Sequence, residues 1–421
     1  MKMSNQHFVP KLILRKFKNK ICLYNIKTGV YEENVKIDDA FSQTDLYGEA
    51  TETKLKDCIE SQFGNLLSNY ILKSDGTVTL SRDQLFIVKK FLLISVLRSF
   101  AGERFVDFEK SIAMHGDGLK RFSPFEEKKI EGETSRDYWL RTLNVVLDTN
   151  GTPEEILEHE DKTYVAYRWS YLIEHAYLAF WDAPAGEEFV ITDVGMTSEN
   201  ERGWDGIFVH NHKKVDYMLE LYEEVKLRQS TGRIVPSRSE IKIINDYNAQ
   251  VNFTENFMMF PTSSKRMIVL ISPFFKKIYE YADFLTTPPA LEELTNIPNY
   301  ELFEPNRVWY KNHKNGRVPS DGDKKYHSDD RYIYDIKRLR PSELWYCNSL
   351  FLDRIDEYIG FSSLEEVYMS ILIYRILNSP PYKPRVDYTS LYEILEKRYS
   401  IEHVVDRIKT ERDKVIEQEA Y

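Results

Sequence analysis

Apolar and polar residues alternate with the period of a β-strand in the first 50 residues of the chain. Residues 21–26 (ICLYNI) alternate, a Lys-Thr-Gly turn occupies residues 27–29, and residues 30–37 (VYEENVKI) continue the pattern. Two alternating runs joined by a short glycine-containing turn predict a β-hairpin. We therefore expect a small β-rich segment at the N-terminal end of the chain.

The period changes to that of a helix from Glu52 onward. Apolar residues three or four positions apart run from Leu55 to Ile71, and this spacing predicts an amphipathic helix. Ser81, a residue type common at helix N-caps, precedes a second periodic stretch that reaches about Phe108. Further helices are predicted at residues 136–148, 153–182, 341–358, 362–378 and 387–415.

Strand patterns return after a Pro-Ala-Gly break at residues 184–186. The predicted strands are residues 188–192, 206–210, 215–225 and 266–272. The order of β, helical, β and helical segments predicts an α+β fold that is dominated by helices. It would hold one small central, mostly antiparallel sheet and the N-terminal β-hairpin.

Four regions, forming one or two compact domains, are expected along the chain. They are an N-terminal signature segment with the hairpin at residues 1–50, a helical region at 51–183, a sheet-containing region at 184–285 and a C-terminal helical region at 286–421. A chain of 421 residues fits such a division, because compact domains commonly hold one to two hundred residues.

Composition excludes several classes of protein. Hydrophobic residues make up 42% and charged residues 29% of the chain, which excludes collagen-like and disordered low-complexity proteins. The net charge of −10 excludes a protein that coats nucleic acid along its whole surface. The polar loops expected at residues 115–135 and 311–331 are rich in Lys, Arg and His, and would supply a local basic surface.

Cysteine usage and hydropathy indicate a reducing, aqueous compartment. The three cysteines lie far apart, so neither a disulfide framework nor a zinc-ligand spacing is present. The most apolar run, residues 85–96, is interrupted by two lysines and is shorter than the ~20 residues that cross a bilayer. We expect a cytoplasmic protein with no membrane partner.

The N-terminal segment is the first candidate for a site. His7 lies close in sequence to Arg15 and Lys16, and a histidine beside cations can act as acid or base on a phosphate. The alternative is structural: Pro10 starts a short helix, Leu12 and Phe17 pack inward, and His7 makes a structural hydrogen bond.

This segment also resembles the opening of an uncharacterised bacterial domain family. His7-Phe8-Val9-Pro10, followed by Leu14-Arg15 and Phe17, matches a signature written HxVPxxxLRxF. Further resemblances follow in order at Asp45–Tyr47, Glu52 and Glu60, Leu93–Arg98, Ile191–Gly195, Phe260–Ser263 and the segment from Asn348. The chain departs from the family pattern after Asp193, where Val194 and Gly195 replace Asn and Pro.

The resemblance implies a bacterial cytoplasmic protein from a phage-defence or toxin-like setting, and it implies no reaction. The site residues carried over from the family motifs are His7, Arg15, Glu60, Arg98 and Asp193. Their chemistry suits a phosphodiesterase: a histidine acid or base, arginines that hold phosphate charge, and a carboxylate that orients the histidine or binds Mg²⁺.

A second candidate is a restriction-like nuclease core. Asp205 precedes a predicted strand, and Glu224 and Lys226 end the next one. Two carboxylates can hold Mg²⁺ while a lysine positions the attacking water. A solvated acidic hairpin accounts for the same residues.

Two functional hypotheses therefore stand. The first is a nucleic-acid phosphodiesterase, an RNase or nuclease effector acting on RNA or DNA in anti-phage defence or a toxin-like system. The second is a non-catalytic protein that binds a partner from a defence operon or senses a ligand. In the second case the signature residues form a buried ion network, with Arg15 or Arg98 paired to Glu60 or Asp193.

Overall fold

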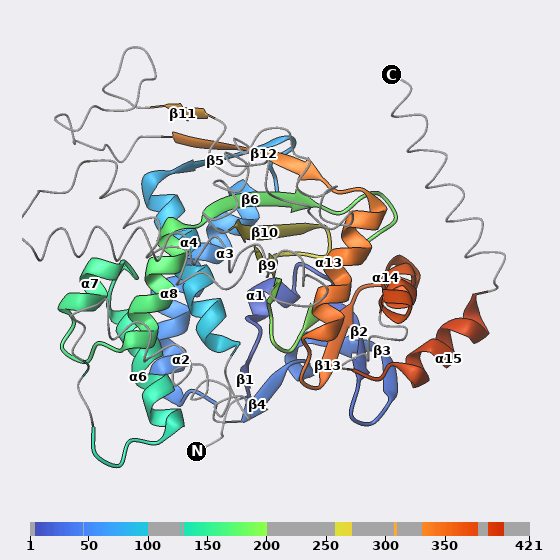
Figure 1. The fold of residues 1–421 in the computed structure, drawn as a ribbon, viewed down its shortest axis with the longest axis horizontal. Helices are drawn as coiled ribbons and strands as arrows, with labels where there is room; N and C mark the ends of the chain where they lie inside the picture. The colour runs from blue at the N-terminus through green and yellow to red at the C-terminus, as the bar shows by residue number, and fades with distance from the viewer. Residues whose placement is uncertain are drawn as a thin grey trace, which may run out of the picture.

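The computed structural model describes residues 5–44, 46–99, 127, 130–199, 257–271, 307–309, 331–377 and 386–399. Within these ranges helices and strands form layers that pack on one another (Figure 1). The predicted α+β fold, dominated by helices, is confirmed. The strands predicted at residues 206–210 and 215–225 lie outside the described residues.

A seven-stranded sheet forms the centre of the fold, in the order β11-β12-β6-β10-β9-β8, with β5 paired to β12. Its strands are β5 (Thr77–Ser81), β6 (Tyr177–Asp182), β8 (Thr197–Glu199), β9 (Phe257–Pro261), β10 (Arg266–Ile271), β11 (Arg307–Trp309) and β12 (Arg331–Arg338). The pairing of β12 with β6 is parallel and every other pairing is antiparallel. The predicted mostly antiparallel arrangement is therefore confirmed.

The central sheet is buried on both faces. Along β6, Leu178 and Phe180 pack into one hydrophobic core, whereas Ala179 and Trp181 pack into the other. Successive strand residues point to opposite faces, so a strand covered on both sides reads as a continuous apolar run. Helices from the N-terminal half cover one face and helices from the C-terminal part cover the other (Figure 1).

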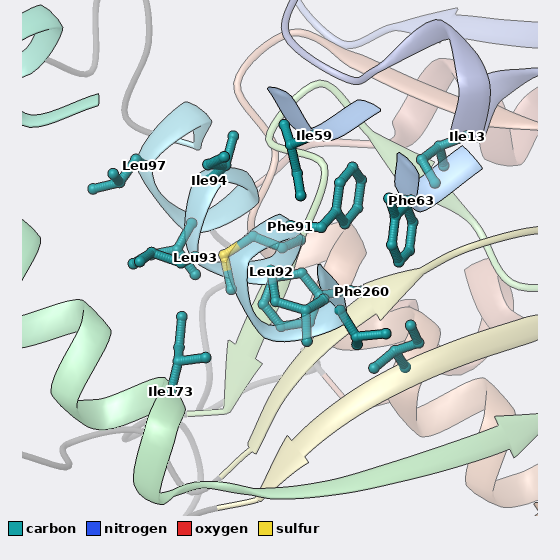
Figure 2. Packing of buried hydrophobic residues seen from close by; sticks show 14 of the residues in the cluster. Ile13, Ile59, Phe63, Phe91, Leu92, Leu93, Ile94, Leu97, Ile173 and Phe260 are labelled. Atoms are coloured by element: carbon teal, nitrogen blue, oxygen red, sulfur yellow. The ribbon is translucent and has the colours of Figure 1, made fainter. Parts of the chain in front are cut away.

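The first helical layer is packed around a stacked pair of rings. Its elements are α2 (Glu49–Leu55), η2 (Lys56–Glu60), α3 (Ser61–Leu66), η3 (Leu67–Ile71), α4 (Arg82–Arg98), α6 (Ser135–Asp148), α7 (Pro153–Glu158) and α8 (Tyr164–His175). Ser81 caps α4 in a capping box with Gln84, as its residue type predicted. Phe63 and Phe91 stack with ring centroids 3.7 Å apart, in the core that Figure 2 shows.

The second helical layer comprises α13 (Pro341–Asp353), α14 (Leu364–Leu377) and α15 (Thr389–Arg398). In the described part of the chain no helix is long and apolar enough to cross a membrane.

The predicted N-terminal hairpin is present and belongs to a second sheet. Strands β2 (Lys20–Asn25) and β3 (Val30–Lys36) form it, and β2 also pairs with β13 (Tyr358–Phe361), which pairs with β7 (Ile191–Thr192). Two short strands, β1 (Asn5–His7) and β4 (Ser42–Thr44), pair separately. The helix α1 (Lys11–Leu14) follows Pro10, and η1 (Ile37–Asp39) follows β3.

Two helix predictions are wrong in part. Residues 153–182 form α7, α8 and the strand β6 instead of one helix, because the apolar run of a strand buried on both faces cannot be told from a buried helix by periodicity. The helix predicted at 341–358 ends at Asp353, and β13 follows it.

Candidate functional site

Five polar residues from four separate segments converge at the N-terminal end of the fold; we call them the signature cluster: His7, Tyr47, Glu52, Glu60 and Arg98. His7 ends β1, Tyr47 follows β4, Glu52 and Glu60 lie on α2 and η2, and Arg98 ends α4. Three of the predicted site residues, His7, Glu60 and Arg98, are thus brought together.

The π-helical turn η2 helps to aim both glutamates at Arg98. In an uninterrupted α-helix, residues eight positions apart would differ in direction by about 80°. A π-helical turn takes up about one extra residue, which brings Glu52 and Glu60 nearly onto one face. Both glutamates of the sequence motif can therefore lie near the Arg98 guanidinium, and Glu60 makes the ion pair with it.

Arg98 is the centre of the cluster and is only 3% exposed. Its Nε donates to the Tyr47 hydroxyl oxygen at 2.9 Å, its Nη2 donates to the His7 carbonyl oxygen at 2.9 Å, and its Nη1 donates to Glu60. The guanidinium also lies over the Tyr47 ring, 5.1 Å from its centroid. These partners offset the cost of burying the positive charge of Arg98. Removing Arg98 or Glu60 would leave the other charge buried without its partner.

Tyr47 links Arg98 to the N-terminal strand and to α6. Its backbone N–H donates to the Gln6 side chain, and its hydroxyl donates to the His7 carbonyl oxygen at 3.3 Å. Its ring stacks on Trp139 with centroids 5.4 Å apart. Burial raises the pKa of Tyr47, which keeps its hydroxyl protonated. The sequence motif contained this tyrosine, but residue chemistry alone did not select it.

His7 is held as a neutral imidazole. Its Nδ1 lies 3.0 Å from the Ala40 carbonyl oxygen, which can only accept, so Nδ1 carries the proton. Burial, followed by the positive charges of Lys11 and Arg98, lowers the pKa of His7 to about 4. The Nε2 lone pair is buried and has no hydrogen-bond partner among the described residues. This ring can accept a proton only at a large energetic cost at neutral pH.

Glu52 lies close enough to Arg98 to feel its charge, but it is not one of the residues that accept the Arg98 hydrogen bonds. Burial raises the pKa of its carboxyl, and the negative charge of Glu60 acts in the same direction, against the positive charge of Arg98. One of its carboxylate oxygens is buried, and no hydrogen-bond partner for it lies in the described part of the chain. The cluster therefore contains two unpartnered acceptor atoms, on His7 and on Glu52.

The two remaining predicted site residues have other surroundings. Arg15 is exposed at the end of α1. Asp193 is 4% exposed, and its carboxylate accepts hydrogen bonds from the backbone N–H groups of Asp356, Glu357 and Tyr358 at 3.2, 2.8 and 3.2 Å. It fixes the turn that leads into β13.

Asn348, in another motif of the resemblance, also joins distant segments. Its Oδ1 accepts from the Val190 backbone N–H at 3.1 Å, and its Nδ2 donates to the Glu188 carbonyl oxygen and to the Ser370 hydroxyl, each at 2.9 Å. The side chain is fully buried. Sequence alone could not identify this role, since the partners are up to 160 residues away.

The alternative metal site, Asp205, Glu224 and Lys226, lies outside the described residues. Among the residues that the structure describes, no three His, Cys, Asp or Glu side chains are grouped so as to hold a metal ion. A role for Mg²⁺ stays a prediction.

Comparison with known proteins gives a family and no activity. A family model described as "Protein of unknown function (DUF4238)" matches residues 5–296, a range that contains the whole signature cluster. No curated protein and no solved structure matches the chain. The expected membership of an uncharacterised domain family is confirmed, and the HxVPxxxLRxF opening as its signature stays a prediction.

Proposed function

The chain belongs to the DUF4238 family of proteins of unknown function, and we propose that it is a non-catalytic protein that recognises a ligand or a partner. In this proposal the signature cluster holds the fold together and does no chemistry. The setting, bacterial defence or a toxin-like system, comes from the family resemblance and is part of the proposal.

The bonding of Arg98 is the observation that carries the proposal. Each of its three nitrogen atoms donates a hydrogen bond to a protein oxygen, and the side chain is almost completely buried. An arginine that stabilises phosphate charge in a transition state must present its donors to the substrate. Arg98 instead joins the end of α4 to η2, β1 and the segment after β4.

Two other motif residues also make hydrogen bonds that hold distant segments together. Asp193 fastens the turn before β13, and Asn348 joins α13 to α14 and to the strand segment near Val190. Each of these polar side chains is buried and bonded to a segment distant in the chain. Such hydrogen bonds would make polar residues at these positions necessary for the fold, even if the protein catalyses no reaction.

The protonation state of His7 supports the same conclusion. General acid–base catalysis near neutral pH works best with a group whose pKa lies near the working pH. His7 has a pKa lowered to about 4 and is 3% exposed. At pH 7 its Nε2 therefore carries no proton to give to a leaving group, and its Nδ1 proton is held by the Ala40 carbonyl oxygen.

The test uses the full chain with His7→Asn. An asparagine amide can donate to the Ala40 carbonyl oxygen in place of Nδ1, and it has no basic nitrogen. Wild type and His7→Asn are incubated with labelled RNA and DNA in the presence of Mg²⁺, and both are also induced in growing bacteria. The proposal expects equal growth and equally intact nucleic acid. Cleavage by the wild type that is lost in a folded His7→Asn protein would establish the phosphodiesterase instead.

A further inference from the structure

A cavity of about 290 Å³ lies where the N-terminal hairpin meets the C-terminal helices, far in sequence from the motif residues of α4. We call it the hairpin pocket. Its walls come from the segment after α1 (Lys18), β2 (Lys20, Cys22), β3, the residues just before and at the start of α14 (from Ser362) and the end of α15 (Arg398). The volume suits a small molecule, since ligand pockets commonly start at about 300 Å³.

Three cations line the hairpin pocket. Arg398 donates to Glu33 at 2.7 Å, which neutralises that carboxylate, and Lys18 donates to the Ser362 carbonyl oxygen at 3.1 Å. Among the residues that the structure describes, the Lys20 side chain has no hydrogen-bond or ion-pair partner. The other carboxylate in the lining is the exposed Glu365.

The pairing of β2 with β3 adds a fourth positive charge next to the pocket. Lys20 and Lys36 are direct partners in the antiparallel register, so their side chains stand on the same face of the sheet. Like charges directly opposite each other destabilise a strand pair. An anion bound between Lys20 and Lys36 would offset this repulsion, so a binding site for an anion would account for two lysines at paired positions.

The backbone of β3 is also distorted at the pocket wall. The register shifts between Ile21 and Leu23, so that Glu33 and Asn34 lie opposite Cys22, and Asn34 has a φ of 62°. A β-bulge redirects the side chains of its strand and is common beside binding sites. The bulge therefore lies in the part of the pocket wall where Glu33 accepts the hydrogen bond from Arg398.

The start of α14 does not supply the binding groups. The Glu188 carboxylate already accepts hydrogen bonds from the backbone N–H groups of Ser362 and Ser363, at 2.6 and 2.8 Å. The attraction for an anion comes from the side chains of Lys18, Lys20 and Arg398 instead.

We propose that the hairpin pocket binds the phosphate group of a small phosphate monoester through Lys18, Lys20 and Arg398. This inference rests on the proposed function, because it names the class of ligand that a sensing protein of this fold would recognise. Lysine serves as a point charge for phosphate, and arginine offers a fork of donors. The size of the pocket favours a single phosphorylated molecule over a polymer.

The experiment is calorimetric titration of the full chain at low ionic strength with inorganic phosphate, ribose 5-phosphate and a short single-stranded RNA. Lys20→Gln removes a charge whose side chain has no bond among the described residues, and Lys56→Gln removes another exposed lysine that lies outside the pocket. We expect the affinity of Lys20→Gln for ribose 5-phosphate to fall about tenfold, as for loss of one charged hydrogen bond. Lys56→Gln should bind like the wild type.

A stability measurement separates binding from folding. Without ligand, Lys20→Gln should melt at the same temperature as the wild type or slightly higher, because its repulsion with Lys36 is gone. Equal binding by wild type and Lys20→Gln, no binding of either phosphate compound, or much tighter binding of the RNA would overturn the proposal. These outcomes leave the His7→Asn comparison untouched, so a failure here is distinguishable from a failure of the proposed function.

Discussion

Lowering the pH should destabilise the fold through His7, and the size of the effect follows from its surroundings. An unfolded histidine has a pKa of 6.5, whereas burial lowers the pKa of His7 to about 4. Between these values the unfolded chain binds a proton that the folded chain excludes. Stability is therefore fully present above pH 6.5 and is lost as the pH falls toward 4.

The two pKa values give the magnitude. At pH 5 the unfolded histidine is almost completely protonated and the folded one almost completely neutral, which corresponds to about 2 kcal/mol of lost stability relative to pH 7.5. The structural cause is specific: the Nδ1 proton is committed to Ala40, and a second proton on Nε2 would place a buried charge near Lys11 and Arg98.

The assay compares urea unfolding of the wild type and His7→Asn at pH 7.5 and pH 5. Other groups titrate in this range as well, so only the difference between the two proteins reports His7. We expect the wild type to lose about 2 kcal/mol more than His7→Asn on acidification. Parallel losses in the two proteins would refute the reasoning, because they would mean that His7 is protonated equally well in the folded and unfolded chains.

Three further predictions concern residues elsewhere in the fold. Asp193→Ala leaves three backbone N–H groups without their acceptor and should cost about 3 kcal/mol by urea unfolding, while exposed Arg15→Ala should change stability by less than about 0.5 kcal/mol. Burial raises the pKa of the Glu188 carboxyl from 4.5 to about 7, so wild-type stability should fall as the pH rises from about 4.5 to 7 and level off above it. Glu188→Gln should abolish that part of the pH dependence, and identical stability profiles of the two proteins would contradict the prediction. Phe63→Ala removes one ring of the stacked pair and should cost about 3–5 kcal/mol, measured by thermal and urea unfolding.

Local signals in the sequence predicted the elements that local physics determines. The capping box at Ser81 starts α4, and the alternation on either side of the Lys-Thr-Gly turn forms the β2–β3 hairpin. The strand β6 escaped prediction because it is apolar on both faces. Its neighbours β10 and β12 are far away in the chain, so only the sheet as a whole identifies it as a strand.

The sequence predicted which residues belong to the candidate site better than it predicted what each residue does there. The family motifs brought His7, Glu60 and Arg98 into one set, and the structure brings the same three together. The family motifs also placed Asp193 in that set, and its acidic side chain suggested a catalytic role, yet its partners are backbone N–H groups more than 160 residues later. Residue type indicates which chemistry is available, whereas burial and long-range bonding decide whether the side chain supports the fold or faces a ligand.

The most direct test of a structural signature cluster is the urea unfolding of Arg98→Gln beside the exposed control Arg15→Gln. The substitution leaves Glu60 without its charged partner and removes one hydrogen-bond donor each from the Tyr47 hydroxyl and the His7 carbonyl oxygen. We therefore expect Arg98→Gln to lose about 3–5 kcal/mol of unfolding free energy. Arg15→Gln should unfold like the wild type. An Arg98→Gln protein as stable as the wild type would contradict the account, because it would show that the guanidinium is held for something other than the fold.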